Sequence, residues 1–232
     1  MKFGIVVFPG STCERDAFNF ITGVLKQECI YLWHQHALPA DLDCILLPGG
    51  FSYGDYLRPG AIAARARIMD SIKKFVYAGG LVIGICNGFQ VLIEAGLLPG
   101  TLLKNRQISF KCRWVDLRVE NNATVFTRHL KQGDLLQMPI AHGDGNYYIR
   151  PKELERLRQD KQIIFKYVDK NGNQTAESNP NGSVDNIAGI INKEGNVLGM
   201  MPHPERAGEA ILGSTHGLKI FESILAQEGE MI

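Results

Sequence analysis

The sequence has no long apolar run and no excess of charge of either sign. A membrane-spanning helix needs about 20 apolar residues, whereas the apolar run at residues 3–8 ends at Pro9-Gly10. We therefore expect neither a membrane segment nor a signal peptide, and a cytoplasmic location. The 25 Lys and Arg residues balance the 24 Asp and Glu residues. This balance disfavours nucleic-acid binding, because proteins with that function usually carry an excess of Lys and Arg.

The sequence also lacks the common patterns for metal, nucleotide and disulfide sites. Its five cysteines are widely spaced, odd in number and without a C-x-x-C pair, which disfavours a disulfide framework and a zinc knuckle. It contains no G-x-x-x-x-G-K-[ST] phosphate-binding loop. We expect no metal and no cofactor in this chain.

The composition is that of an ordinary globular protein. Of the 232 residues, 45% are hydrophobic and 21% are charged, close to the average for folded domains. A chain of this length can bury a substantial core. We expect a single domain spanning residues 1–232.

The first part of the chain alternates apolar, β-branched runs with amphipathic segments. Strands are predicted at residues 3–8, 29–33, 43–47 and 81–85, and helices after Ser11-Thr12, at 61–77 and at 88–95. Continuous apolar strands are typical of parallel sheets covered on both faces. The alternation therefore predicts an α/β fold with a doubly wound, mostly parallel open sheet and helices on both faces.

After Pro99 the pattern changes to alternating polar and apolar residues, which is typical of antiparallel strands. The segments concerned are residues 109–119 and 135–141, and we expect them at the edge of the sheet. Further predicted elements are a helix at 152–159, a surface loop at 170–183, a β-hairpin from 187–191 and 197–201, also expected at the edge of the sheet, and a closing helix at 215–227.

Cys86 lies where a predicted strand meets a predicted helix. The sequence Gly84-Ile85-Cys86-Asn87-Gly88 has the G-x-C-x-G form of a nucleophile elbow, in which a sharp turn exposes the nucleophile above the sheet. Backbone N–H groups after Cys86 can stabilise an oxyanion, and the helix dipole favours a thiolate. We expect Asn87 to be one oxyanion donor. The motif alone is equally compatible with a buried cysteine between two packing glycines.

His203-Pro204-Glu205 supplies the other groups that a cysteine nucleophile needs. In an extended segment the two outer side chains point the same way. The histidine can hold the cysteine as a thiolate and protonate the leaving group, while the carboxylate fixes the imidazole. An H-x-E string also opens the zinc deaminase signature, which needs a later P-C-x-x-C. No cysteine follows Cys112, so deamination is excluded.

A Pro-Gly-Gly turn ends the predicted strand at residues 43–47. Small residues at Gly49 and Gly50 would let the backbone approach a ligand and donate a second oxyanion hydrogen bond. Taken alone, the turn is better explained as a simple tight turn.

Together these segments resemble the class I, or triad, glutamine amidotransferases. The resemblance rests on the Pro-Gly-Gly turn, the G-x-C-x-G elbow with Gln90 four residues on, and the late His-Pro-Glu, in matching order over nearly the whole chain. It implies the following site residues: Cys86 as nucleophile, His203 and Glu205 as its partners, Gly50 and Asn87 as backbone oxyanion donors, and Gln90 as a contact for glutamine.

Longer strings resemble one branch of that family, the glutaminases of de novo purine biosynthesis. The strings are residues 48–64, 110–114, 141–148 and 179–183. The resemblance implies hydrolysis of glutamine through a cysteine thioester, with the ammonia used to convert formylglycinamide ribonucleotide to formylglycinamidine ribonucleotide. It implies two partners, a large synthetase subunit that holds ATP and Mg²⁺ and a small third subunit. Asp144 departs from the pattern, since the branch more often has glutamate there.

The loop at residues 51–60 follows the Pro-Gly-Gly turn and carries Tyr and Arg residues, which are enriched at interfaces. We expect Tyr53, Asp55 and Arg58 to contact the partner. Two other readings remain open at this point. The chain could be another cysteine-elbow hydrolase, such as a peptidase, or a redox-sensing regulatory subunit with Cys86 as a reactive thiol. A sensor thiol, however, needs no carboxylate behind its histidine.

Overall fold

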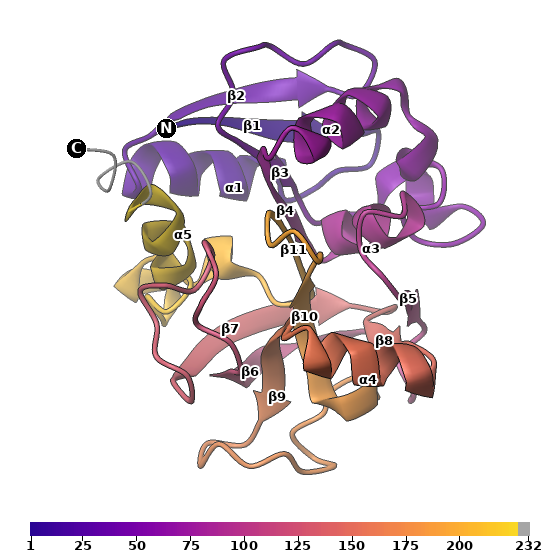
Figure 1. Ribbon diagram of the computed structural model, residues 1–232, viewed down its shortest axis with the longest axis vertical. Helices are drawn as coiled ribbons and strands as arrows, with labels where there is room; N and C mark the ends of the chain where they lie inside the picture. The colour runs from indigo at the N-terminus through magenta and orange to yellow at the C-terminus, as the bar shows by residue number, and fades with distance from the viewer. Residues whose placement is uncertain (227–232) are drawn as a thin grey trace.

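The computed structural model describes residues 1–226. A nine-stranded sheet forms the centre of this part of the chain (Figure 1). The strand order is β2-β1-β3-β4-β11-β10-β9-β6-β7. The first five strands in this order pair in parallel. Their bounds are β2 Glu28–Trp33, β1 Lys2–Val7, β3 Cys44–Leu47, β4 Leu81–Ile85 and β11 Val197–Met200.

The other four strands extend the same sheet in antiparallel fashion. They are β10 Ile187–Ile191, β9 Ile163–Val168, β6 Lys111–Val119 and β7 Leu135–His142. A separate two-stranded sheet joins β5 Thr101–Leu103 to β8 Asn146–Tyr148. The predicted hairpin is formed by β10 and β11, but its expected place at the edge of the sheet is wrong. It lies in the middle, because β11 pairs in parallel with β4 and β10 pairs with β9 on its other side.

Helices cover both sides of the central strands. Figure 1 shows α1 and α5 to the left of these strands and α2 and α3 to the right. The helices are α1 Glu14–Asn19, which continues as a π-helical turn at Phe20–Val24, α2 Arg67–Tyr77, α3 Asn87–Glu94, α4 Pro151–Gln159 and α5 Leu218–Leu225. This arrangement confirms the predicted α/β class. None of the described helices is long and apolar enough to cross a membrane.

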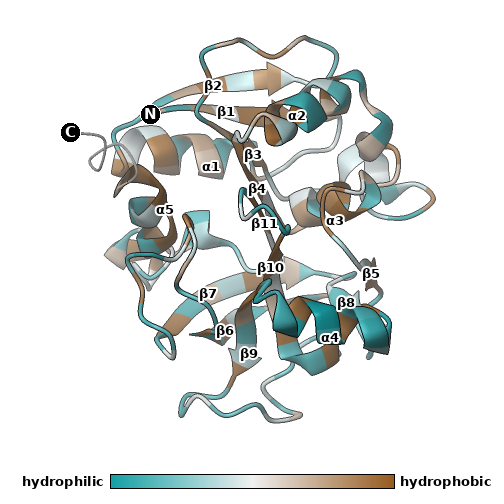
Figure 2. Cartoon of the chain, in the orientation of Figure 1, coloured by the Kyte–Doolittle hydropathy of each residue, from teal (hydrophilic) through white to brown (hydrophobic). Residues whose placement is uncertain are grey.

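The core follows from the composition of the central strands. Every residue of β3, β4 and β11 is buried, and these strands carry no charged side chain. Figure 2 shows the hydrophobic colouring concentrated on them, whereas α4 is largely hydrophilic. Only two residues of α4, Leu154 and Leu157, are buried. These three strands are neighbours in the sheet, so their carboxyl ends lie side by side above a buried apolar core.

The structure also differs from the sequence prediction in several helices and strands. The helix expected from Ala61 begins at Arg67, because Ala66 is extended at φ −63° and ψ 147° and separates it from a short 3-10 turn at Ala63–Arg65. Strand β9 was not predicted, although its six residues are mostly β-branched or aromatic. The closing helix is shorter than expected, and Gln227, its predicted end, lies outside the described residues.

Candidate active site

Cys86 occupies a strained turn between β4 and α3. Its backbone has φ 51° and ψ −107°, a conformation that non-glycine residues seldom adopt and that a surrounding structure must enforce. The two flanking glycines make the turn possible. A Cβ on Gly84 would lie 2.5 Å from Leu92, and one on Gly88 would lie 1.9 Å from the carbonyl oxygen of Leu47. The structure therefore forms the elbow that the sequence pattern indicated.

His203 and Glu205 lie just beyond the end of β11. The Nδ1 atom of His203 lies 2.6 Å from Oε1 of Glu205, and the two residues are 1% and 3% exposed. The backbone N–H of His203 donates to the carbonyl of Pro139 on β7, which ties this segment to the neighbouring part of the sheet. Because β4 and β11 are paired in parallel, their ends bring Cys86 and His203 to the same place.

The surroundings of His203 favour its charged form. Burial by itself lowers the pKa of the imidazole, but the Glu205 carboxylate and the nearby Cys86 thiolate more than offset this effect and hold the pKa well above its usual value. These two negative groups therefore favour the imidazolium form of the ring. A cation beside Cys86 stabilises the thiolate form of a cysteine.

The Pro-Gly-Gly turn closes the site from the β3 side. A Cβ on Gly49 would lie 2.8 Å from His203 Cε1, 2.9 Å from Cys13 Sγ and 3.5 Å from Cys86 Cβ. Glycine at this position is thus required by the closeness of three functional side chains. Gly50 has φ +147°, and a Cβ there would lie 2.7 Å from the backbone nitrogen of Thr12.

The loop after β1 holds this turn in place. The N–H groups of Thr12 and Cys13 both donate to the carbonyl of Gly49, and the N–H of Phe51 donates to the carbonyl of Gly10. Three backbone hydrogen bonds therefore fix the conformation on both sides of Gly50. The conformation of the predicted oxyanion turn depends on this N-terminal loop.

A polar cluster surrounds the start of α3. The side-chain amide of Asn87 donates to Oε1 of Gln90 at 2.8 Å and to Oδ1 of Asp55 at 3.3 Å. Its oxygen accepts from the N–H of Ser52, and the Gln90 amide donates to the carbonyl of Asp144. Both ends of the Gln90 side chain are therefore bonded to protein groups, and they link α3 to the loop between β7 and β8.

Asp55 and Asp144 bring negative charge to this cluster. Burial, together with the neighbouring Asp144 carboxylate, raises the pKa of Asp55 to about 6. Both residues are half-buried. The cluster is thus a place where a cationic group of a ligand would relieve the unfavourable burial of charge.

The three residues expected to contact a partner differ in exposure. Tyr53 is half-buried, and its hydroxyl lies 2.8 Å from Nδ1 of His34. Arg58 is exposed but forms a two-pronged ion pair with Glu94. The most exposed apolar side chains of this loop are instead Tyr56 and Leu57, at 71% and 81%.

The strings at residues 141–148 and 179–183 meet in a buried hydrogen-bond network. Asn105 Oδ1 accepts from the N–H of Gly145 and lies 3.2 Å from His142 Nδ1. The amide nitrogen of Asn181 lies 3.5 Å from His142 Nε2. Burial and the nearby His203 lower the pKa of His142 to about 4, so this second histidine is neutral. The network fixes the end of β7 and the loop that follows it, and the carbonyl of Ala141 on β7 is 3.6 Å from Cys86 Sγ.

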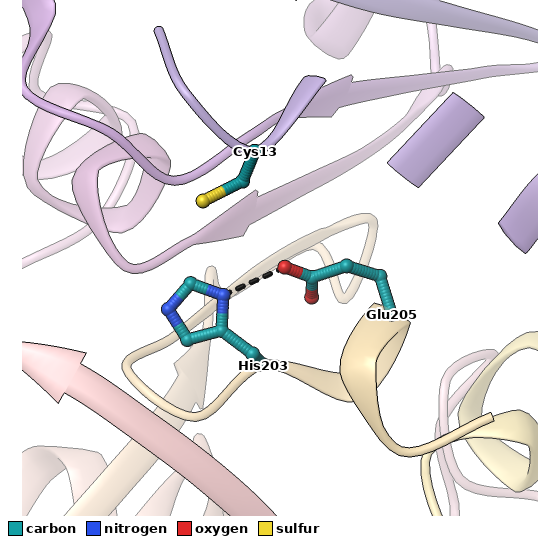
Figure 3. Close-up of side chains that lie close together, drawn as sticks. All are labelled: Cys13, His203 and Glu205. Carbon is teal, nitrogen blue, oxygen red and sulfur yellow. Dashed lines mark hydrogen bonds and ion pairs between the residues drawn. The ribbon is translucent and has the colours of Figure 1, made fainter. Parts of the chain in front are cut away.

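Sequence reasoning missed Cys13, which lies beside the histidine and the carboxylate (Figure 3). It is 4% exposed, and burial raises the pKa of its thiol. Arg206 Nη2 lies 3.2 Å from its sulfur and also pairs with Asp16. No local motif marks Cys13, because its position depends on a contact between two distant parts of the chain.

The arrangement combines four features that acyl transfer requires. It has a thiol on an elbow, an imidazolium close to that thiol, a buried carboxylate on the far ring nitrogen, and two backbone segments at the mouth of the elbow. Such a site can form and break an acyl thioester.

Comparison with known proteins identifies relatives over nearly the whole chain. Residues 1–222 match the family described as CobB/CobQ-like glutamine amidotransferase domain. The chain is 55% identical over 225 residues to phosphoribosylformylglycinamidine synthase subunit PurQ of Moorella thermoacetica, covering 97% of this chain and 95% of that protein. It is 53% identical to the protein of the same name from Aquifex aeolicus, covering 97% and 100%.

A solved structure shows the same fold. A chain of the PurLQS structure from Thermotoga maritima superposes with a TM-score of 0.87 at 45% identity, covering 98% of each chain. The likeness spans both the parallel and the antiparallel parts of the sheet.

Proposed function

The chain belongs to the CobB/CobQ-like glutamine amidotransferase family, as a member of its PurQ branch, and we propose that Cys86, His203 and Glu205 are its catalytic triad. The enzyme takes ammonia from glutamine. The observation that carries the assignment of residues is the buried 2.6 Å contact between His203 and Glu205 beside the strained Cys86 elbow.

In the proposed reaction the Cys86 thiolate attacks the carboxamide carbon of glutamine. The tetrahedral oxyanion accepts hydrogen bonds from the backbone N–H groups of Gly50 and Asn87. His203 gives its proton to the departing ammonia, which leaves a γ-glutamyl thioester on Cys86. His203 then takes a proton from water, the hydroxide attacks the thioester, and glutamate is released with the thiolate restored.

Glu205 orients the imidazole and stabilises its charged form through the first half of this cycle. Gln90 and Asn87 arrange the edge of the substrate site. The cluster containing Asp55 and Asp144 is suited to the α-ammonium group of glutamine, since two half-buried carboxylates face one region. Gln90 would contact glutamine from within this cluster.

We infer the acceptor of the ammonia from the relatives. The proteins at 53–55% identity are subunits of phosphoribosylformylglycinamidine synthase, and the related structure is of a PurLQS assembly. The chain is thus the glutaminase subunit of that synthase in purine biosynthesis. Its partners are a large synthetase subunit of the PurL type, which converts formylglycinamide ribonucleotide to formylglycinamidine ribonucleotide with ATP and Mg²⁺, and a small subunit of the PurS type.

The loop at residues 51–60 is the proposed place of contact with the synthetase subunit. It follows the oxyanion turn directly, and five of its residues have positive φ: Tyr53, Gly54, Asp55, Leu57 and Gly60. The exposed Tyr56 and Leu57 extend the predicted interface set of Tyr53, Asp55 and Arg58. The single domain over residues 1–232 and the cytoplasmic location stay predictions.

The test is a Cys86→Ala variant assembled with its two partner subunits. We expect no glutamine-dependent synthesis but unchanged ammonia-dependent synthesis, because the variant lacks the ammonia source and keeps the ligase. Loss of both activities in an assembled complex would contradict this division of labour. A Cys86→Ala variant that still uses glutamine would favour a reaction that does not need Cys86. Ordinary peptide hydrolysis by the unaltered chain would favour the peptidase reading, and an inactive chain with an oxidisable Cys86 would favour the sensor reading.

A further inference from the structure

Cys13 has no part in the proposed glutaminase reaction, yet it faces the catalytic histidine and carboxylate (Figure 3). Its sulfur, a ring nitrogen of His203 and a carboxylate oxygen of Glu205 all lie within 4.8 Å of one another. All three residues are buried, at 4%, 1% and 3% exposure. The cluster is built from two distant regions, the loop before α1 and the 3-10 turn after β11.

The donor atoms are those that zinc prefers. Cysteine sulfur, histidine nitrogen and glutamate oxygen are the protein ligands of Zn²⁺, and nitrogen and sulfur sites bind it more strongly than most divalent ions of the first row. A Cys13 thiolate and the Glu205 carboxylate would supply two negative charges, which balance the charge of the ion. His203 would bind as a neutral ring.

A second observation points to a ligand at this place. Oε2 of Glu205 is buried without a hydrogen-bond partner in the described structure, although buried polar atoms are nearly always paired. The thiol and the ring are both bordered by Gly49, which brings no side chain to this side of the cluster. The cluster therefore has an unused carboxylate oxygen beside the thiol and the ring.

The dimensions are close to those of a bound ion. With Zn–S of about 2.3 Å and Zn–N or Zn–O of about 2.0 to 2.2 Å, tetrahedral ligand atoms lie roughly 3.3 to 3.6 Å apart. Every separation in the cluster is within 4.8 Å, so the longest gap has to close by at most about 1.2 to 1.5 Å to reach that geometry. Movement of the unbranched Cys13 side chain can close this gap. His203 Nδ1 and Glu205 Oε1 lie 2.6 Å apart, so these two atoms have to separate or Glu205 has to bind through Oε2.

We propose that Cys13, His203 and Glu205 form an inhibitory zinc site. On binding, Zn²⁺ takes the place of the thiol proton of Cys13 and of the proton between His203 and Glu205, and both protons pass to solvent. No electron is transferred. The inhibition, as distinct from the binding, rests on the proposed function, because a metal-bound His203 cannot protonate the departing ammonia.

Binding is tested without relying on catalysis, in the Cys86→Ala chain. Zn²⁺ alone is titrated in competition with a chromogenic chelator. We expect one tightly bound ion per chain, and affinity at least about 100-fold weaker after Cys13→Ser in the same background, since even changes behind a metal ligand cost about 10- to 100-fold. Cys112→Ser is the matched control, because Cys112 is exposed and is not one of the three clustered residues, and it should leave the affinity unchanged.

If the Cys86→Ala chain binds no zinc ion tightly, the proposal is overturned, because any zinc binding by the unaltered chain would then depend on Cys86. Equal affinity with and without Cys13 would also overturn it. If the Cys13→Ser chain does not fold, Glu205→Gln in the Cys86→Ala background serves the same purpose, and we expect a weakening of at least about 10-fold. Unchanged affinity in that chain would contradict the ligand set.

Inhibition is tested on glutamine hydrolysis by the chain with an intact Cys86. Zn²⁺ should abolish hydrolysis, a chelator should restore it, and the Cys13→Ser chain should need at least about 10-fold more zinc, each chain being compared with its own zinc-free rate. Equal sensitivity of the two chains would overturn the inhibitory role. A chain that binds zinc through Cys13 but never hydrolyses glutamine would contradict the proposed function and leave the metal site standing.

Discussion

His203 and Glu205 lie two residues apart in the sequence, and their side chains meet at 2.6 Å in a fully enclosed position. Pro204 between them lies at the start of a 3-10 turn, so the contact is made within one turn of chain. The pair therefore needs little tertiary support for its own geometry, whereas its position against Cys86 depends on the pairing of β4 with β11.

The first prediction concerns the role of Glu205. Glu205→Gln removes the negative charge that raises the pKa of His203, so the imidazole loses its proton at lower pH. We expect kcat for glutamine to fall by about 10² to 10⁴, less than for Cys86→Ala. The fall in kcat on the alkaline side of the pH profile should also move to lower pH.

Steady-state kinetics across pH, with Glu209→Gln as control, measures both effects. Glu209 is an exposed carboxylate four residues further on, and its loss should leave kcat unchanged. Full activity in Glu205→Gln, with an unmoved alkaline limb, would remove Glu205 from the triad.

The second prediction concerns the glycine of the elbow. A Cβ at position 88 would lie 1.9 Å from the backbone oxygen of Leu47, and a backbone atom on a central strand cannot move aside easily. We expect Gly88→Ala to lower the free energy of unfolding by about 3 kcal/mol or more, at the upper end for overpacking.

Urea denaturation measures this change, and Gly23→Ala is the matched control. Gly23 lies in the π-helical turn with nothing within 4 Å of a Cβ, so alanine there should be neutral or stabilising by up to about 1 kcal/mol. Equal stability of the two variants would show that the elbow tolerates bulk and that β3 and α3 are less closely packed than described.

Much of this site could be predicted from local sequence. The elbow and the His-Pro-Glu turn were found because each is set by residues that are adjacent in the chain, with glycine and proline restricting the backbone. The parallel strands were found because they are continuously apolar. Cys13 could not be found, since its contact with His203 joins residues from opposite ends of the chain.

Other differences between prediction and structure have local physical causes. The start of α2 was placed too early because the alanines at 61, 63, 64 and 66 favour a helix, whereas tertiary packing holds Ala66 extended. Strand β9 begins four residues after the end of α4, and no glycine or proline separates the two elements. The strings that carry the resemblance contain His142 and Asn181 but not Asn105, and the network itself could not be predicted because its members come from three separate segments of the chain.

The third prediction concerns Asp55 and the pH dependence of stability. Its pKa is raised from 3.8 to about 6 in the folded chain, so the folded state binds more protons than the unfolded state between these values. Stability then falls as pH rises from about 4 to about 6. Asp55→Asn removes this penalty, and we expect a higher melting temperature than that of the unaltered chain at pH 7.5.

At pH 4 the two chains should melt at nearly the same temperature, because Asp55 is protonated in the folded state. Thermal unfolding followed by circular dichroism at both pH values measures this difference. Asp160→Asn, which changes an exposed carboxylate outside the cluster, is the control. A lower melting temperature for Asp55→Asn at pH 7.5 would show that the Asp55 carboxylate stabilises the fold.

The central claim is that Cys86 is the nucleophile. A diazo-ketone analogue of glutamine is incubated with the chain, and the labelled peptide is identified by mass spectrometry. We predict one label per chain on Cys86, because its thiol lies on the elbow beside His203, and no label in the Cys86→Ala chain. A label on Cys13, Cys29, Cys44 or Cys112 with Cys86 unmodified would contradict the account.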